Sequence, residues 1–436
     1  MTDPVNIPWG KETINLSLPS EWHLAGRFEP STNLPPVDVP DAVKKAINGP
    51  VMSPSLRASI KTGMRITIVI DDLSRPTPVS QILPIVLEDV TAAGVDLSNI
   101  TVIPALGVHR PMTDEEVRIR LGDHVNVEVK WESHNCDDPE KMKFLGTTSR
   151  GTPVWINRTV AESDLIISIG CIEPHIIASF GGGYKNIVPG VAGRLTIAHN
   201  HAINCQPGTF NMVGQPIDGN PMRLDLEEAA GMMHKPVFVI NAVLNSSLRP
   251  VRFVAGDPIA AHREGCRTSA EIYSARVPKE VDVVITSSNP MDSDLRQGVK
   301  ALANTIRAVR RGGVLIVLAR AEEGLGVFGL ANKKLPVSRG ILKLIAPIIL
   351  PLVPRLKIKN MGEEDKFFLY FALQAMNRCR LVMYAPTIPQ EARDNLVFIE
   401  FVNSPDEAIE LARQKFSKKA EVAIFPHGGM TYPIVG

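Results

Sequence analysis

The feature that most constrains this chain is a repeated alternation of short β-rich runs with helical stretches. MRITIVI (64–70), ITVIPAL (100–106) and DLIISIG (164–170) have the composition of buried strands. Alternation of strands and helices predicts an α/β fold with parallel or mixed sheets. In this first set, further elements are expected as helices at 79–93 and 113–121 and as a strand at 126–131.

A second α/β set begins late in the chain. Strands are expected at 281–288, 312–319, 395–401 and 420–426, and helices at 295–310 and 405–415. A length of 436 residues allows two or three domains. We therefore predict two α/β domains, with a hinge near 275–281 (ARVPKEV).

Composition excludes several classes of protein. Lysine and arginine total 47 and aspartate and glutamate 46, so the balance gives no argument for nucleic acid or an anionic membrane surface as a partner. Five cysteines without a C-x-x-C pair make a disulfide framework or structural zinc improbable. The longest apolar run, 341–353, is too short to span a bilayer and contains two prolines. We expect a soluble, cytoplasmic protein.

Two polar clusters follow expected strands, where α/β proteins bind ligands. In DDLSRPTP (71–78), Arg75 can bind a carboxylate or phosphate, although a capped turn with a solvated arginine is equally compatible. In ALGVHRPMTDEE (105–116), Thr113 and Glu116 have capping-box spacing. His109 lies in that loop, and a lone histidine is more often structural than catalytic.

The third cluster, 171–204, again starts at a strand end. It contains His175, a glycine triplet at 181–183, Lys185, and the pair His199 and His201. The spacing matches neither a P-loop nor a G-x-G-x-x-G fingerprint. On a strand the two paired histidines would face one way, whereas on a helix they would point about 200° apart.

The fourth cluster, 289–302, places Gln297 and Lys300 three residues apart, hence on one face of the expected helix. Taken together, three histidines, two cations and a glycine loop at strand ends indicate a site that binds an anion and moves protons. The residues by themselves do not name a reaction.

These clusters resemble the lactate racemase family and its 2-hydroxyacid racemase and epimerase relatives. The matching segments are DDLSRPTP, GVHRPMTDEE, EPHIIASFGGGYKNIVPG, the following HNH, and DLRQGVKAL, in the family's order between 71 and about 302. The resemblance implies an isomerase with an active-site cleft between its two domains. It also implies that the C-terminal tail returns to the larger domain, giving domains of 1–276 plus about 416–436, and of 280–415.

The resemblance further implies a cofactor, the nickel-pincer nucleotide, joined to Lys185 as a thioamide and loaded by cofactor maturation enzymes. His201 takes the place of the histidine that ligates nickel. His109 and His175 match the family's two acid–base histidines. These remove and return the hydroxyl proton, while C2 is inverted by reversible hydride transfer to the cofactor. Arg75, Gln297 and Lys300 match the family's substrate-binding residues, and the resemblance leads us to expect the nucleotide near Asp72, Ser74, Gly182 and Gly183.

Departures from the family pattern bear on the substrate. Tyr184 stands before the lysine where the family often has arginine, and Arg296 stands before Gln297 where it usually has tyrosine. In relatives an aromatic residue lines one wall of the active site. The nearest match in this chain is Phe367, in the segment Asp365-Lys366-Phe367. We predict that Arg296 binds substrate, and that this substrate is larger or more polar than lactate; a solvent-facing Arg296 is the alternative.

Two other functions remain open from the sequence. One is a nicotinamide-dependent 2-hydroxyacid dehydrogenase, which would share the hydride chemistry but lacks its dinucleotide fingerprint here. The other is an anion- or nucleotide-binding relative without racemase activity. Three retained histidines argue against that second alternative, because binding alone does not need paired acid–base groups.

Overall fold

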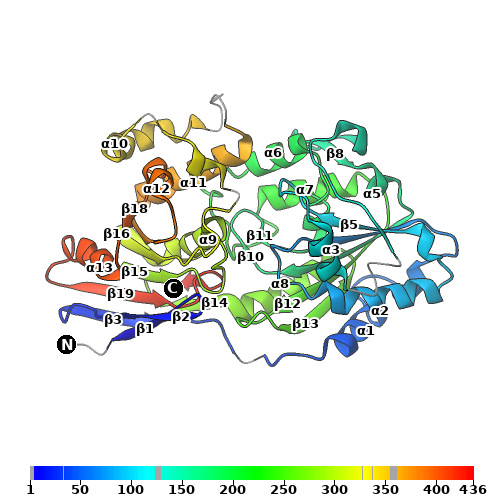
Figure 1. Ribbon diagram of the computed structural model, residues 1–436, viewed down its shortest axis with the longest axis horizontal. Coiled ribbons are helices and arrows are strands. Elements are labelled where there is room, and N and C mark those ends of the chain that lie inside the picture. Colours follow the sequence, from blue (N-terminus) through cyan, green and yellow to red (C-terminus); the bar gives the residue numbers. More distant parts are fainter. Residues whose placement is uncertain (1–3, 33, 123–128, 327, 336, 354–360) are drawn as a thin grey trace. The chain divides into compact units, whose positions relative to one another are not determined.

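The structure is a computed structural model, and it describes residues 4–32, 34–122, 129–326, 328–335, 337–353 and 361–436. The chain divides into two compact units. Unit 1 comprises residues 1–32, 204–214 and 272–436, and unit 2 comprises 33–203 and 215–271. Each unit is built around its own six-stranded sheet, and Figure 1 labels strands of both sheets.

The sheet of unit 2 has the strand order β13-β12-β9-β4-β5-β6. All of its pairings are parallel except that of β12 with β13, so it is a mixed sheet. Its strands are β4 (Ile66–Asp71), β5 (Ile100–Ala105), β6 (Lys130–Trp131), β9 (Leu165–Ile172), β12 (Val237–Leu244) and β13 (Pro250–Gly256).

The strand order of unit 2 determines where a ligand can bind. From β4 the chain moves to β5 and β6 on one side, and then returns to β9 on the other side of β4. Ligands of open α/β sheets bind at such a reversal, outside the carboxyl ends of the strands. The segments that follow β4, β5 and β9 therefore converge at one place, and they carry the predicted clusters.

The remaining elements of unit 2 cover and extend this sheet. Its helices are α1 (Val39–Asn48), α2 (Val79–Ala92), α3 (Asp114–Leu121), α5 (Arg158–Glu162), α6 (Arg194–Ala202), α7 (Pro221–Gly231) and α8 (Ala260–Tyr273), the last ending in unit 1. Two short antiparallel pairs are β7 (Met142–Thr147) with β8 (Pro153–Asn157), and β10 (Pro174–His175) with β11 (Ser179–Phe180).

Unit 1 contains a fully parallel sheet with the order β18-β17-β16-β15-β19-β3. Its strands are β3 (Trp22–Arg27), β15 (Val281–Ser287), β16 (Val309–Leu318), β17 (Arg380–Tyr384), β18 (Glu400–Val402) and β19 (Ala420–Phe425). The pair β1 (Val5–Trp9) and β2 (Glu12–Leu16) is antiparallel, and β14 (Ser274–Val277) pairs with β20 (Tyr432–Val435) in parallel. The helices are α9 (Leu295–Thr305), α10 (Arg339–Ile349), α11 (Glu363–Arg378), α12 (Gln390–Asn395) and α13 (Pro405–Arg413).

The predicted α/β fold is confirmed, and most expected elements lie within a few residues of their predicted bounds. The strand predicted at 395–401 is wrong over most of its length, because Ile399 N–H donates to Leu396 O in a turn and β18 begins only at Glu400. Leu396, Phe398 and Ile399 in that segment are buried, although they form no hydrogen-bonded strand pairing. The strand predicted at 126–131 falls partly outside the described residues.

The predicted domain boundaries differ from the observed units. Residues 1–32 belong to unit 1 because β3 pairs with β19, and the tail belongs there too because β20 pairs with β14. The predicted hinge at 275–281 therefore lies inside unit 1, where it comprises the end of β14, the connection to β15 and the first residue of β15. The chain instead passes between the units near residues 32, 203, 214 and 271.

All five cysteines are free and buried. Within the ranges that the structure describes, no helix combines the length and apolar character needed to span a membrane.

Candidate active site

The turn after β4 is held in shape by a buried ion pair. Arg120 on α3 pairs with Asp71 at the end of β4, and its other nitrogens donate to the carbonyls of Asp71, Arg75 and Thr77 at 2.9–3.1 Å. Thr77 Oγ1 also donates to Asp71 Oδ2 at 2.5 Å. One arginine thereby stabilises the whole 71–77 turn, which presents Asp72 and Arg75.

His109 and Asp72 form a hydrogen-bonded pair at this turn. His109 Nδ1 lies 2.5 Å from Asp72 Oδ2, and Asp72 Oδ1 accepts from the hydroxyl and the amide of Ser74 at 2.5 and 3.1 Å. Burial opposes ionisation of Asp72, but the bonds from His109 and Ser74 and the charge of Arg75 outweigh it and hold the pKa of the Asp72 carboxyl well below its usual range. An ionised carboxylate accepts, so Nδ1 of His109 carries a proton and Nε2 carries the lone pair in the neutral ring.

The predicted role of Asp72 and Ser74 in holding the nucleotide stays a prediction, and the contacts of the two side chains bear on it. An ionised carboxylate would repel a phosphate, and Ser74 donates to that carboxylate rather than outward. In this structure Asp72 bonds to His109, and Ser74 bonds to Asp72, so the two residues also hold the orientation and tautomer of His109.

His175, at the end of the short β10 strand, has the opposite arrangement. The backbone amides of Ile177 and Ala178 donate to its Nδ1 at 3.3 and 3.1 Å. Because Nδ1 accepts these bonds, the proton of the neutral imidazole is on Nε2. In the neutral rings the same atom, Nε2, thus carries the lone pair in His109 and the proton in His175.

Arg75, the predicted anchor for a substrate carboxylate, is itself paired. Its guanidinium contacts Glu173, which follows β9 and is 6% exposed, while Arg75 is 19% exposed. This ion pair joins the carboxyl ends of β4 and β9, the two strands at the reversal of strand order. A substrate carboxylate at Arg75 must share the guanidinium with Glu173.

The glycine loop packs tightly against its own unit. Gly182 and Gly183 have φ values of +78° and +61°, and a Cβ on them would lie 2.6 Å from Ile172 and 2.9 Å from His262. Gly183 N–H donates to Asn241 Oδ1 at 2.8 Å. Close packing and left-handed backbone therefore account for glycine here, and cofactor binding by these two residues stays a prediction.

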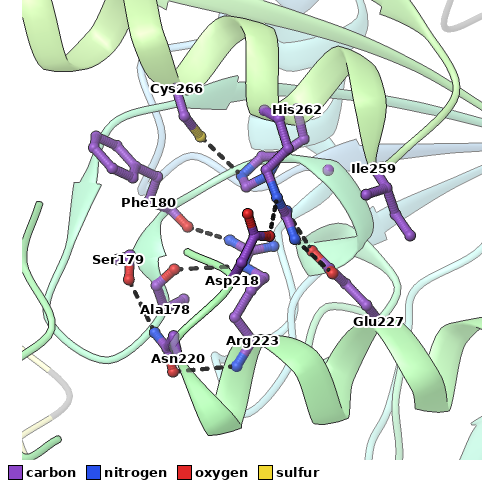
Figure 2. A network of polar contacts seen from close by, with 12 residues as sticks. Ala178, Ser179, Phe180, Asp218, Asn220, Arg223, Glu227, Ile259, His262 and Cys266 are labelled. Atoms are coloured by element: carbon purple, nitrogen blue, oxygen red, sulfur yellow. Dashed lines mark hydrogen bonds and ion pairs between the residues drawn. The ribbon is translucent and has the colours of Figure 1, made fainter. Parts of the chain in front are cut away.

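A buried arginine holds the segment before Lys185 in place. Arg223 on α7 is fully buried and donates to three carbonyls, those of Ala178, Phe180 and Gly182. Asn220, at the N-terminus of the same helix, donates to Ile177 O and Ser179 Oγ. Figure 2 shows these side chains reaching from the helix to the loop. Burial lowers the pKa of Arg223 to about 10, which still leaves it charged at neutral pH.

The remaining carbonyl of this loop is bound by His262 from α8. Burial and the charges of Arg223 and Arg263 hold the pKa of His262 well below its ordinary value, so the ring is neutral. Its Nε2 donates to Gly181 O at 2.8 Å, and its Nδ1 accepts from Arg263, which also forms a bidentate ion pair with Glu227 at 2.7 and 2.9 Å. Side chains of α7 and α8 thus bind consecutive carbonyls of the segment that leads to Lys185 (Figure 2).

Lys185 and His201 occupy positions suited to their predicted roles. Lys185 lies in a 3₁₀ turn, Gly183–Asn186, directly after the loop. The pair His199 and His201 is helical, on α6, so the two side chains point in different directions. His201 Nδ1 donates to Ile197 O at 2.8 Å, which leaves the lone pair of the neutral ring on Nε2. A histidine that ligates a metal through one nitrogen usually donates the other to a carbonyl in this way.

The predicted substrate residues of α9 belong to unit 1. Gln297 N–H is capped by Asp294 at 2.8 Å, whereas its buried Oε1 has no hydrogen-bond partner among the residues that are described. Lys300 Nζ lies 3.9 Å from Met291 Sδ. The guanidinium of Arg296 lies 5.8 Å from the ring centre of Phe368. The predicted wall residue Phe367 is 1% exposed and belongs to the core, so the aromatic beside Arg296 is Phe368.

Sequence reasoning missed several residues of this site. Glu173, Asn220, Arg223, Asn241 and His262 act through contacts with segments distant in the chain. Only Glu173 had a local signal, since it immediately precedes the Pro-His pair at a strand end. The others lie on helices or a strand where the sequence shows nothing unusual.

Comparisons with known proteins agree with this site. Residues 9–210 match the family model described as the lactate racemase N-terminal domain. The chain is 30% identical over 326 residues to the lactate racemase of Thermoanaerobacterium thermosaccharolyticum, covering 74% of this chain and 75% of that protein. It is 28% identical to the lactate racemase of Lactiplantibacillus plantarum, covering 97% of this chain and 98% of the relative.

Solved structures extend the comparison. The lactate racemase apoprotein from T. thermosaccharolyticum superposes with a TM-score of 0.84 at 26% identity, covering 99% of this chain and all of the other. A Thermotoga maritima protein shares the fold, with a TM-score of 0.65 at 15% identity over 92% of this chain and 99% of its own. The chain belongs to the lactate racemase family, and it is an isomerase of the racemase type.

Proposed function

We propose that this protein inverts the C2 centre of a 2-hydroxyacid by reversible hydride transfer, using a nickel-pincer nucleotide joined to Lys185. The observation that carries the proposal is the opposite proton placement on two histidines. In the neutral rings, His109 has the lone pair on Nε2, and His175 has the proton there. A reaction that removes a hydroxyl proton on one side and returns one on the other needs two groups that can each hold a proton, and in the neutral rings one Nε2 can accept a proton while the other can donate a hydrogen bond to the substrate oxygen.

The positions of the two histidines in the sheet support this assignment. His109 follows β5 and His175 follows β9, the strands on either side of β4. Two strand spacings separate such strand ends by about 10 Å, enough for a small hydroxyacid to be reached from both sides. His109 takes the hydroxyl proton as the C2–H bond breaks, and the planar 2-oxoacid turns before it is reduced on its other face. His175 then reprotonates the oxygen from its imidazolium form and returns to the neutral ring. The reverse direction exchanges the two roles.

The residues present fit the proposed cofactor. Within the described ranges no group of three or more histidine, cysteine, aspartate or glutamate side chains is arranged to hold a metal. A nickel ion at His201 Nε2 would therefore need its other donors from a non-protein ligand, and sulfur donors beside one imidazole suit nickel. Lys185 offers the amine for covalent attachment. When bound, the cofactor supplies a hydride acceptor, so that the C2–H bond can break without forming a carbanion beside a carboxylate.

The charges and polar groups of the predicted substrate-binding residues fit a hydroxyacid. In this proposal Arg75 binds the substrate carboxylate, sharing its guanidinium with Glu173. Gln297 offers an acceptor that has no partner in the described part of the chain, and Lys300 adds a second cation. Arg296 lies on the same helix, α9, as Gln297 and Lys300. Its guanidinium lies over the ring of Phe368 from α11 and adds a positive charge there. A substrate larger or more polar than lactate would use that additional charge.

The cofactor assignment is tested by mass spectrometry of peptides that contain Lys185. The protein is co-expressed with the cofactor's maturation enzymes, which in this proposal are its partners in the cytoplasm, and a loaded relative serves as the parallel control. We expect a nucleotide-sized adduct on Lys185 and none in Lys185→Ala. An unmodified lysine beside a loaded relative would contradict the proposal.

The reaction is tested with a 2-hydroxyacid panel deuterated at C2. Hydride transfer returns the same hydrogen, so the inverted product should keep its deuterium in ordinary water. Loss of the label to solvent would indicate proton abstraction from C2 and overturn the hydride mechanism. Lactate as the best substrate of the panel would overturn the proposed preference for larger or more polar acids.

A further inference from the structure

Two neighbouring cavities in unit 1 lie among basic side chains that the proposed reaction does not use. The first, with a volume of about 490 Å³, includes Arg339, Lys343, Arg378, Arg380 and Lys415 in its lining. The second, of about 360 Å³, includes Arg307, Arg311 and Arg378. Both are lined by Asn377 and Arg378 at the end of α11, so they adjoin at these residues.

The positive charge around these cavities is only partly neutralised. Seven lysine or arginine side chains line them, whereas Glu400 is the one carboxylate in either lining. Glu400 pairs with Arg339 and, in a bidentate manner at 2.6–2.7 Å, with Arg380. Arg378 pairs with Glu280 at 2.6 Å from outside the linings. Two carboxylates for seven cations leave a local excess of about five positive charges.

The basic side chains that line the two cavities lower one another's pKa. Burial and the neighbouring Arg380 lower the pKa of Arg339 to about 10. Burial and the charges of Lys343, Arg310 and Arg380 lower the pKa of Lys415. Burial and Arg378 lower the pKa of Arg307. An arrangement that destabilises its own charged groups is more typical of a binding site than of a surface that only needs solubility.

One donor in the second cavity lacks a partner. Arg307 donates from Nη2 to Asn211 O at 2.6 Å, but its buried Nε has no hydrogen-bond partner among the described residues. A buried donor without a partner is costly. Gln374 and Asn377 add amide groups to the same lining.

We propose that these two cavities form one binding site for a phosphate-bearing anion with at least two charged groups. Arginine forks match phosphate oxygens in geometry, and a single carboxylate would neutralise too little of the charge. The two lobes on either side of Arg378 would each receive one anionic group. This site lies entirely in unit 1 and is separate from the histidines, Arg75 and Lys185 of unit 2.

The test uses inorganic tripolyphosphate, titrated into the full-length protein by calorimetry at low ionic strength in a buffer without phosphate. Arg311→Gln/Lys343→Gln removes one cation from each lobe. Neither side chain has a hydrogen bond or ion pair to another described residue, so the double variant should fold normally, which circular dichroism verifies. We expect binding that weakens with added salt and is reduced about tenfold or more in this variant.

The matched control is Lys44→Gln/Lys61→Gln, which removes the same charge from exposed positions of unit 2. It should bind tripolyphosphate like the unmodified protein. Equal affinity of Arg311→Gln/Lys343→Gln and the control, or no binding to the unmodified protein at millimolar concentration, would overturn the site. Citrate binding as tightly as tripolyphosphate would overturn its assignment to phosphate.

Discussion

At the residue scale, the proposed reaction depends on which nitrogen of each histidine carries the proton. Asp72 fixes that choice for His109 with a carboxylate, and two backbone amides fix it for His175. A carboxylate can stabilise the imidazolium that forms when His109 accepts a proton, whereas amide donors at Nδ1 cannot. The two histidines are therefore chemically unequal, although the task that we propose for them is symmetric.

The first prediction concerns this pair. An amide at position 72 can donate to Nδ1 and so place the ring proton on Nε2, which is the wrong atom for a base. We expect Asp72→Asn to lower kcat by about 10²- to 10⁴-fold while changing KM much less. Interconversion of enantiomers by the loaded enzyme, followed by chiral chromatography, measures both constants.

The control for that prediction is Asp114→Asn, an exposed acidic residue in the first turn of α3. It should leave kcat within about a factor of two, because exposed substitutions rarely alter a site. An Asp72→Asn enzyme as fast as this control would show that the Asp72–His109 bond has no part in the reaction.

At the scale of elements, helices α7 and α8 hold the loop that leads to Lys185. Three carbonyls accept from Arg223 and one from His262. Without these donors the carbonyls would be buried and unpaired, since the surrounding residues are fully buried. The position of Lys185 is thus determined by two helices that follow it in the chain.

We therefore predict that Arg223→Met destabilises unit 2 by about 3 kcal/mol or more, and that it reduces the fraction of Lys185 carrying the adduct. Urea unfolding measures the first effect and peptide mass spectrometry the second. Arg223→Lys should rescue only part of either, because an ammonium group cannot reach three carbonyls in a plane. Arg249→Met, at an exposed position of unit 2, is the control and should change neither. Normal loading in Arg223→Met would contradict the prediction.

A third prediction concerns acid sensitivity. His134, in the segment between β6 and β7, is 2% exposed, and burial lowers its pKa to about 4. The unfolded chain binds a proton near pH 6.5, so between pH 6.5 and 4 the unfolded state holds more protons and the free energy of unfolding falls as pH falls. This one residue should account for about 3 kcal/mol of that loss.

Urea titrations at pH 7 and pH 5 test this contribution by comparing the protein with His134→Gln. The substitution costs some stability at pH 7, because Nε2 bonds to Ala192 O at 3.1 Å. Its free energy of unfolding should nevertheless decline less on acidification. His234→Gln is a suitable control, since His234 is an exposed histidine of the same unit. The same pH dependence of the free energy of unfolding in His134→Gln as in the unmodified protein would contradict this prediction.

At the scale of the whole molecule, each unit has its own hydrophobic core. In unit 2 one cluster contains Ile167 of β9 and a second contains Ile166, while in unit 1 a separate cluster contains Ile285 of β15. Because each unit has its own core, the two units can unfold in separate transitions rather than in one all-or-none transition. Stability should be measured separately for each unit.

The fourth prediction is that core truncations act on one unit at a time. Ile285→Ala should lower the free energy of unfolding of unit 1 by about 3 kcal/mol, and Ile167→Ala should do the same in unit 2, because both side chains are fully buried. Hydrogen exchange resolved by peptide should accelerate in the strands of the altered unit. Equal acceleration in both units from either substitution would show that they unfold together.

The sequence by itself determined the elements and the chemistry that follows them. Apolar runs such as those of β4, β9 and β15 predict strands because their periodicity is local, and polar clusters at strand ends predict a ligand site because sheets bind at that edge. The motif order also indicated the family. Each of those signals is local, because it is contained in a short segment of the chain.

Only the tertiary structure decided which of these residues meet. Asp72 bonds to His109 and Arg75 to Glu173 because β4 lies between β5 and β9, a strand order that no local pattern encodes. The same is true of Arg223, whose contacts lie more than forty residues away. The terminal segments joined unit 1 because β3 and β20 complete its strand pairings. Hydrogen bonding between distant segments is a property of the folded chain, and it set both the tautomers of the histidines and the boundaries of the units.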